Sequence, residues 1–115
     1  MPVTPSEFRR IALSFPETEA QSHMGHPDFR VAGKIFATLG YPDRASGMVK
    51  LTRVEQRMFV EAEPEAFQPC AGAWGRRGAT NVKLGLVKRV TLRRAMAAAW
   101  ELTAPPRLTR QKPTA

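Results

Sequence analysis

The sequence predicts one α+β domain in which a five-stranded antiparallel sheet carries its helices on one face. Three observations favour this fold. Short apolar segments typical of strands alternate with turns that contain glycine and proline. Two helical segments begin with capping boxes, and a third helical segment closes the domain. The predicted order, α-β-β-β-α-β-β-α, is that of a two-layer domain.

The length and composition are those of a small globular protein. The chain has 115 residues, of which 43% are hydrophobic and 24% charged. We expect a single domain over residues 1–104 and a basic, flexible tail over residues 105–115. No apolar run approaches the roughly 20 residues that span a bilayer, and the first residues do not form a secretory signal. Cys70 is the only cysteine, which excludes an internal disulfide. These features favour a cytoplasmic protein, and we expect a monomer or a weak dimer.

The first helix is predicted from its cap and its spacing. Thr4 and Glu7 form a capping box, and Pro16 ends the helix near residue 14 or 15. The apolar side chains that recur at helical spacing between these signals are Phe8, Ile11, Ala12 and Phe15.

Three strands are predicted next, as a meander. Residues 17–27 are polar and irregular, and we expect them to form a loop. Residues 29–31 and 35–39 resemble strands on either side of a tight turn with a glycine, and residues 48–51 form the third strand.

A second helix is predicted from residue 52 to about residue 61. Thr52 and Glu55 form its capping box. Val54 and Met58 lie four residues apart, which places them on one helix face. We therefore expect them to form its buried edge.

The rest of the domain is predicted as a connector, two short strands and a long helix. Phe67 is the expected apolar anchor of the connector at residues 63–69. Short strands are expected near residues 73–74 and 79–84, and a helix is expected from about residue 88 to residue 103. The apolar face of this helix consists of Leu92, Ala95, Met96, Ala99 and Leu102.

Positive charge is concentrated in the second half of the chain. Residues 1–65 carry eight Lys or Arg and nine Asp or Glu, whereas residues 66–115 carry ten basic residues and a single acid. The net charges are therefore −1 and +9. Such asymmetry favours an anionic partner, such as DNA or another nucleic acid, or an acidic protein. A merely solubilising basic surface is an equally consistent interpretation.

The candidate binding site is centred on Trp74 and two arginines that lie between glycines. Arginine and lysine bind phosphates without reading sequence, and an exposed tryptophan can stack on a base. Packing in the core is the favoured alternative for Trp74. It also remains open whether the cations converge on one surface. The basic residues predicted to contact phosphates are Arg76, Arg77, Lys83, Lys88, Arg89, Arg93 and Arg94.

Three motifs resemble the MmcQ/YjbR family, and the similarity runs from about residue 8 to residue 102. The resemblance implies an α-β3-α-β2-α fold related to secretion-chaperone-like domains, and a DNA-binding label. The motifs are His23-Met24-Gly25-His26-Pro27-Asp28-Phe29-Arg30-Val31, Gly33-Lys34-Ile35-Phe36-Ala37-Thr38-Leu39 and Ala73-Trp74-Gly75-Arg76-Arg77-Gly78-Ala79-Thr80.

Residues with metal-binding or nucleophilic chemistry are few. His23 and His26 have an H-x-x-H spacing, and Asp28 or Cys70 could complete a metal site, but a second close ligand pair is missing. The histidines are therefore expected to orient their loop, and Cys70 to be a small buried thiol. No motif predicts a cofactor or an enzyme.

Two alternatives to nucleic-acid binding remain open. One is a protein-interaction module that docks a partner on its sheet face or on an edge strand. The other is a small-molecule pocket around Trp74, His23, His26 and Phe36.

Overall fold

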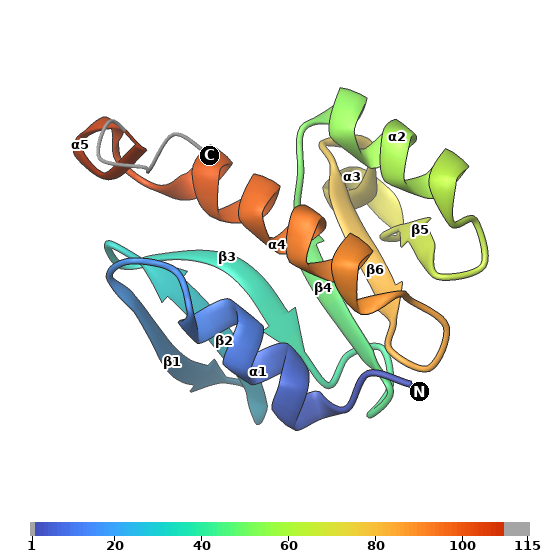
Figure 1. Ribbon diagram of the computed structural model, residues 1–115, viewed down its shortest axis with the longest axis horizontal. Helices are drawn as coiled ribbons and strands as arrows, with labels where there is room; N and C mark the ends of the chain where they lie inside the picture. The colour runs from blue at the N-terminus through green and yellow to red at the C-terminus, as the bar shows by residue number, and fades with distance from the viewer. Residues whose placement is uncertain (1, 110–115) are drawn as a thin grey trace.

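The structure, a computed structural model, describes residues 2–109 as a two-layer domain. A six-stranded antiparallel sheet has the order β1-β2-β3-β4-β6-β5, and α1 and α4 lie across one of its faces (Figure 1). The strands are β1 (Thr18–His23), β2 (His26–Val31), β3 (Lys34–Leu39), β4 (Ser46–Lys50), β5 (Phe67–Pro69) and β6 (Ala79–Lys83). The helices are α1 (Pro5–Leu13), α2 (Arg53–Ala62), α3 (Gly72–Arg76), α4 (Arg89–Thr103) and α5 (Pro106–Thr109). The α+β fold is as predicted, but the sheet has six strands and not five.

Both predicted capping boxes are present. The Glu7 amide donates to the Thr4 hydroxyl over 3.1 Å, and the Thr4 amide donates to the Glu7 carboxylate over 3.2 Å. At the start of α2 the corresponding Thr52–Glu55 hydrogen bonds are 3.1 and 2.9 Å long. Each box satisfies amide groups that the first helical turn leaves without partners.

The additional strand comes from residues 17–27, which were predicted as a loop. They form β1 and the start of β2, joined by a tight turn in which Met24 and Gly25 have φ angles of 51° and 79°. Because β1 is an edge strand with mostly exposed side chains, its sequence lacks the apolar alternation that identifies a half-buried strand.

The region after α2 also differs from its prediction. Phe67 is buried as expected, but it begins strand β5 in the middle of the predicted connector. Residues 73–74, predicted as a strand, belong to the short helix α3. Elements of three and five residues are too short to carry a readable period. Pairing with β6 and close backbone contacts with the preceding segment therefore decide these structures.

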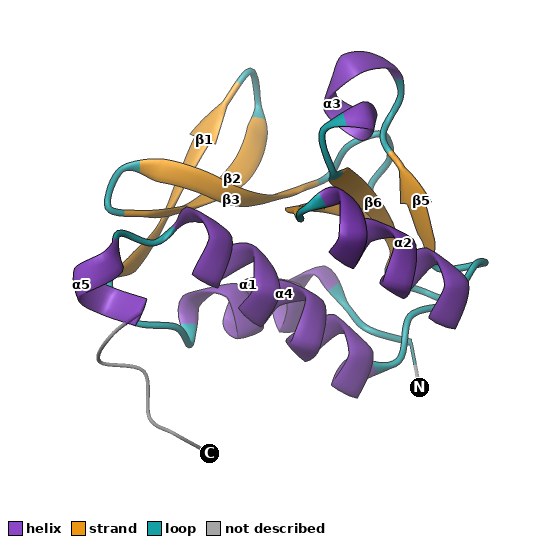
Figure 2. Cartoon of the chain, turned by 90° about the horizontal axis from the view of Figure 1, so that it is seen from above, coloured by secondary structure: helices purple, strands orange, loops and turns teal. Residues whose placement is uncertain are grey.

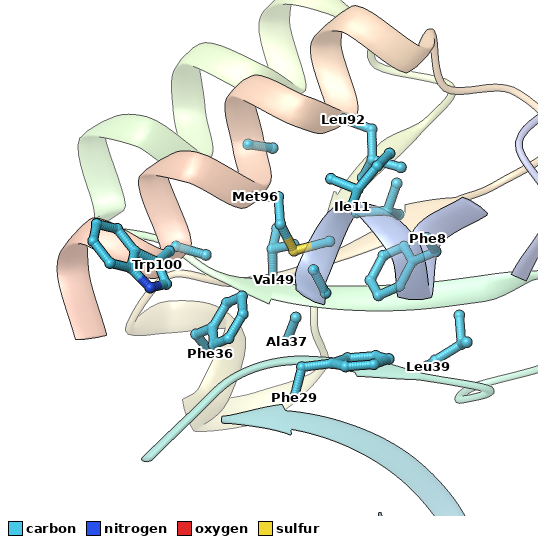
Figure 3. Packing of buried hydrophobic residues seen from close by; sticks show 14 of the residues in the cluster. Phe8, Ile11, Phe29, Phe36, Ala37, Leu39, Val49, Leu92, Met96 and Trp100 are labelled. Atoms are coloured by element: carbon cyan, nitrogen blue, oxygen red, sulfur yellow. The ribbon is translucent and has the colours of Figure 1, made fainter. Parts of the chain in front are cut away.

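The core lies between the sheet and the layer formed by α1 and α4 (Figure 3). Trp100 closes one end of it, and its indole N–H donates to the Pro16 carbonyl over 3.1 Å. The predicted buried face of α4 is confirmed except at Leu102, which is 49% exposed. The buried side chains labelled in Figure 3 are Phe8, Ile11, Phe29, Phe36, Ala37, Leu39, Val49, Leu92, Met96 and Trp100.

The predicted buried edge of α2 is wrong. Val54 and Met58 are 67% and 60% exposed, whereas Phe59 and Val60 pack against the core. The helix lies at the β5 end of the sheet, where β5 meets one side of it and the opposite side faces solvent. Val54 and Met58 do share one helix face, as their four-residue spacing predicts, but this face is turned to solvent and not to the core.

Part of the predicted flexible tail is structured. α4 ends before Pro105 as expected, but residues 106–109 form α5 with Leu108 buried. Arg107 forms a bidentate ion pair with Glu17, with N–O distances of 2.8 and 3.0 Å. The rest of the predicted tail, 110–115, lies outside the described residues. No helix within residues 2–109 combines the length and apolarity needed to cross a membrane.

Gly78 provides a test of the backbone geometry that positions α3. Its φ is +119°, and a Cβ added there would lie 1.9 Å from the Leu51 carbonyl oxygen. We expect Gly78→Ala to lower the free energy of unfolding by about 1–3 kcal/mol, because the backbone must shift to accept the methyl group. Urea unfolding measures this. Gly85→Ala is the control, since a Cβ there meets no atom within 4 Å; equal unfolding midpoints for the two variants would contradict the geometry.

Candidate functional site

The basic residues predicted as one surface are divided between two sides of the sheet. Arg93 and Arg94 are exposed on α4, which covers the core face. Arg76 is the last residue of α3 and Arg77 is its C-cap, and α3 lies on the opposite side of the sheet (Figure 2). Lys83 is exposed at the end of β6, and Lys88 is the N-cap of α4. The predicted set therefore does not form a single patch.

Arg89 already has a partner within the domain. Its guanidinium forms an ion pair with Glu7, with an Nη2–Oε1 distance of 2.8 Å, and it also donates to the Pro2 carbonyl. The hydrogen bond from Arg89 lowers the pKa of Glu7 to about 2. The same contact raises the pKa of Arg89 above its usual value. This arginine joins α4 to α1.

A different group of arginines converges between α2 and α3. Arg53 and Arg57 are four residues apart on α2, and with Arg76 of α3 they line an open pocket of about 670 Å³. No acidic side chain lines this pocket. None of these three arginines forms an ion pair with a carboxylate within residues 2–109. An anion entering the pocket would thus meet guanidinium groups that no carboxylate neutralises.

Contacts with backbone carbonyl groups hold α2 and α3, the two walls of the pocket, together. The Gln56 side-chain amide donates to the carbonyls of Gly75 and Ala79, over 2.9 and 3.0 Å. A Cβ on Gly75 would lie 1.7 Å from the Cys70 carbonyl oxygen, so only glycine permits α3 to approach that segment. The glycines around the arginine pair therefore fix the position of α3. Of these two glycines, only Gly78 has a positive φ.

A second cavity, which we call the sheet cleft, lies on the sheet face opposite the core. Its volume is about 730 Å³. Side chains that alternate with the core residues of β3, β4 and β6 form its floor, and α3 and the β1–β2 hairpin flank it (Figure 2). The lining residues are His23, Ile35, Thr38, Tyr41, Pro42, Met48, Pro69, Cys70, Ala71, Trp74, Ala79 and Asn81.

Trp74 is exposed, contrary to the favoured prediction that it packs in the core. It is 62% accessible to solvent, and the Lys50 ammonium lies 5.7 Å from the centroid of its ring. Trp74 borders both the sheet cleft and a neighbouring hollow that Lys50 and Lys34 line. Lys50 is placed for a cation–π contact with the indole, and the exposed part of the ring can stack on a planar ligand.

A buried carboxylate orients one histidine at the rim of the cleft. Asp28 is fully buried and accepts hydrogen bonds from Arg30 Nε over 2.8 Å and Arg30 Nη2 over 3.1 Å. His23 Nδ1 lies 2.7 Å from the Asp28 carboxylate. The hydrogen bonds from Arg30, and secondarily from His23, lower the pKa of Asp28. When neutral His23 donates through Nδ1, its Nε2 atom is left as a hydrogen-bond acceptor.

The two histidines are strand residues and not loop residues. His23 and His26 are cross-strand partners at the end of the β1–β2 hairpin, and the rings of His26 and Tyr41 form a T-shaped contact at a centroid distance of 5.8 Å. Both line a hollow of about 400 Å³ beside the sheet cleft. Phe36, predicted to share a pocket with them, is buried in the core. No cluster of three metal-binding side chains occurs within residues 2–109.

Cys70 is half-buried and hydrogen-bonded. Its thiol donates to Asn81 Oδ1 over 3.1 Å, and burial raises the pKa of the thiol. This hydrogen bond orients the Asn81 side chain, because its amide oxygen points toward the Cys70 thiol.

Sequence reasoning missed Arg53 and Arg57. Both lie in the first half of the chain, where the net charge is close to zero because acidic residues are about as frequent as basic ones. The distribution of net charge along the chain therefore does not identify them. Their four-residue spacing on a predicted helix was the available signal, because it places two cations on one helix face.

The Asp28 ion pairs predict a pH-dependent contribution to stability. Because folding lowers the pKa of Asp28, its contribution is complete above the usual aspartate pKa of 3.8 and is lost as the pH falls through the lower, folded value. We expect Asp28→Asn to lower the free energy of unfolding by about 1–3 kcal/mol at pH 7. This deficit should narrow on acidification, as urea unfolding at several pH values would show.

Glu65→Gln is the matched control for Asp28→Asn, because Glu65 is exposed and forms no ion pair within the described part of the chain. Its stability should follow wild type throughout. A deficit for Asp28→Asn that stays constant down to low pH would contradict the assigned role of Asp28.

Comparison with known proteins agrees with this architecture. A crystal structure of the Deinococcus radiodurans protein DR2400, which has a DUF419 domain, matches with a TM-score of 0.76 and 13% identity. The match covers 95% of this chain and 87% of that chain, and at this identity it shows the fold alone. A comparison with curated proteins found no match. The family model described as YjbR matches residues 13–102, so the chain belongs to the YjbR family.

Proposed function

We propose that this protein is a non-catalytic nucleic-acid-binding module whose phosphate contacts come from α2 and α3. The observation that carries this proposal is the pocket lined by Arg53, Arg57 and Arg76, beside the exposed Trp74. Guanidinium groups bind phosphate oxygens through charge-assisted and often bidentate hydrogen bonds. Their contacts with a phosphate backbone are independent of base sequence.

A single strand is the form of nucleic acid that this surface suits. Single-strand binding combines a positive groove for the backbone with aromatic side chains on which unpaired bases stack. Here Trp74 is an exposed aromatic residue close to the arginines, and Lys50 and Lys34 extend the positive charge beyond it. The α4 arginines are less suitable for the same ligand, because α4 lies across the sheet from α3, which carries Arg76 and Trp74 (Figure 2).

The protein-interaction alternative has one feature in its favour. β1 is an edge strand of six residues, and its outer side pairs with no other strand within residues 2–109. Such an edge can accept an added strand from a partner. A pull-down whose bound protein survives nuclease treatment and is lost on changing β1 would favour this function over the proposed one.

Fluorescence anisotropy with a labelled single-stranded oligonucleotide tests the proposed function. Three phosphate contacts predict that log K falls with log salt at a slope of about −2, since each contact on a single strand contributes about −0.7. We expect the double variant Arg53→Gln/Arg57→Gln to bind about tenfold or more weakly at low salt, with a slope of about −0.7.

The matched control is Arg93→Gln/Arg94→Gln, which removes the same charge from exposed positions on α4. It should bind nearly as wild type does. No binding of wild type at low salt, or equal losses in the two double variants, would overturn the proposed function.

A further inference from the structure

We propose that the sheet cleft binds one unstacked nucleobase. The phosphate attached to this base lies in the pocket lined by Arg53, Arg57 and Arg76, which we call the arginine pocket. This inference rests on the proposed function and deepens it by assigning a role to a cavity that phosphate contacts do not use. The cleft has a volume of about 730 Å³, within the range of roughly 300–1,000 Å³ that is usual for ligand pockets.

Aromatic side chains are available for the flat faces of a base. Trp74 and Tyr41 both line the cleft and are 62% and 63% exposed. Trp74 stands on α3, and Tyr41 follows β3, where it contacts His26 of the β1–β2 hairpin. Figure 2 shows α3 and this hairpin rising from the same side of the sheet. A ring stacked on Trp74 would replace exposed aromatic surface with contact between two π systems.

Polar groups with fixed orientation are available for the edge of a base. The Asn81 amide oxygen accepts from the Cys70 thiol, and its nitrogen has no hydrogen-bond partner within residues 2–109. His23 is oriented by Asp28, which leaves Nε2 for a ligand, and Thr38 contributes a hydroxyl. Donors and acceptors of this kind recognise the hydrogen-bonding edge of a base that has left its stack.

The connection between the two cavities sets the ligand class. Pro69 and Cys70 line both the sheet cleft and the arginine pocket, so one short segment separates them. A base in the cleft can therefore be joined through its sugar to a phosphate on the other side of this segment. Both a nucleotide within a nucleic-acid strand and a free nucleotide contain a base joined through a sugar to a phosphate. A comparison of strands with a free nucleotide distinguishes these two ligands.

The test compares three ligands by competition anisotropy: an oligothymidylate, a strand of the same length with abasic spacers, and free thymidine monophosphate. We expect the oligothymidylate to bind wild type about 5- to 100-fold more tightly than the abasic strand, with equal salt slopes. Trp74→Ala should remove most of this difference. Because Trp74 is exposed, the variant should keep its fold; Val90→Ala, an exposed apolar change on α4, is the control.

Each outcome decides the inference. Equal affinities of wild type for the two strands would overturn the base site while leaving the proposed function intact. Binding of neither strand at low salt would overturn the proposed function itself. Competition by free thymidine monophosphate that Trp74→Ala abolishes would support the base site and identify free nucleotides as a source. A base-dependent affinity that Trp74→Ala leaves unchanged would place the base elsewhere and overturn the inference.

Discussion

The close backbone approach of α3 is the constraint on which the rest of the candidate site depends. A Cβ on Gly75 would overlap the Cys70 carbonyl, and a Cβ on Gly78 would overlap the Leu51 carbonyl. Gln56 then ties α2 to the same place with two hydrogen bonds. These contacts place guanidinium groups on one side of the segment before α3 and an indole ring on the other. Both the arginine pocket and the sheet cleft follow from them.

The two faces of the sheet separate the apolar core from the candidate binding site. Side chains on one face, together with α1 and α4, form the apolar core. The same strands present half-buried polar and apolar side chains to the cleft on the opposite face, where no long helix covers them (Figure 2). Because successive side chains of a strand point to opposite faces, the same strands form the core on one face and the candidate binding surface on the other. Basic residues occur on both sides of the sheet, since Arg93 and Arg94 are exposed on α4, which covers the core.

Much of the fold could be predicted because long elements carry clear signals. The capping boxes at Thr4 and Thr52 and the apolar face of α4 are local properties of the sequence. β1 and α3 could not be predicted, because an exposed edge strand lacks alternation and a five-residue helix lacks a period. For the site, Trp74 and Arg76 were predicted as candidate residues, whereas Arg53 and Arg57, which line the same pocket as Arg76, were not. Arg53 and Arg57 join them only through tertiary contacts, which net charge along the chain does not report.

The central claim is that nucleic acid binds on the α3 side of the sheet. The most direct measurement is the change in backbone amide NMR shifts during titration with a short single strand at low salt. The account predicts that the perturbed amides cluster in residues 53–57 and 70–81, with further changes near His23 and Thr38. Perturbations concentrated at residues 89–94 of α4, with α3 unaffected, would contradict it.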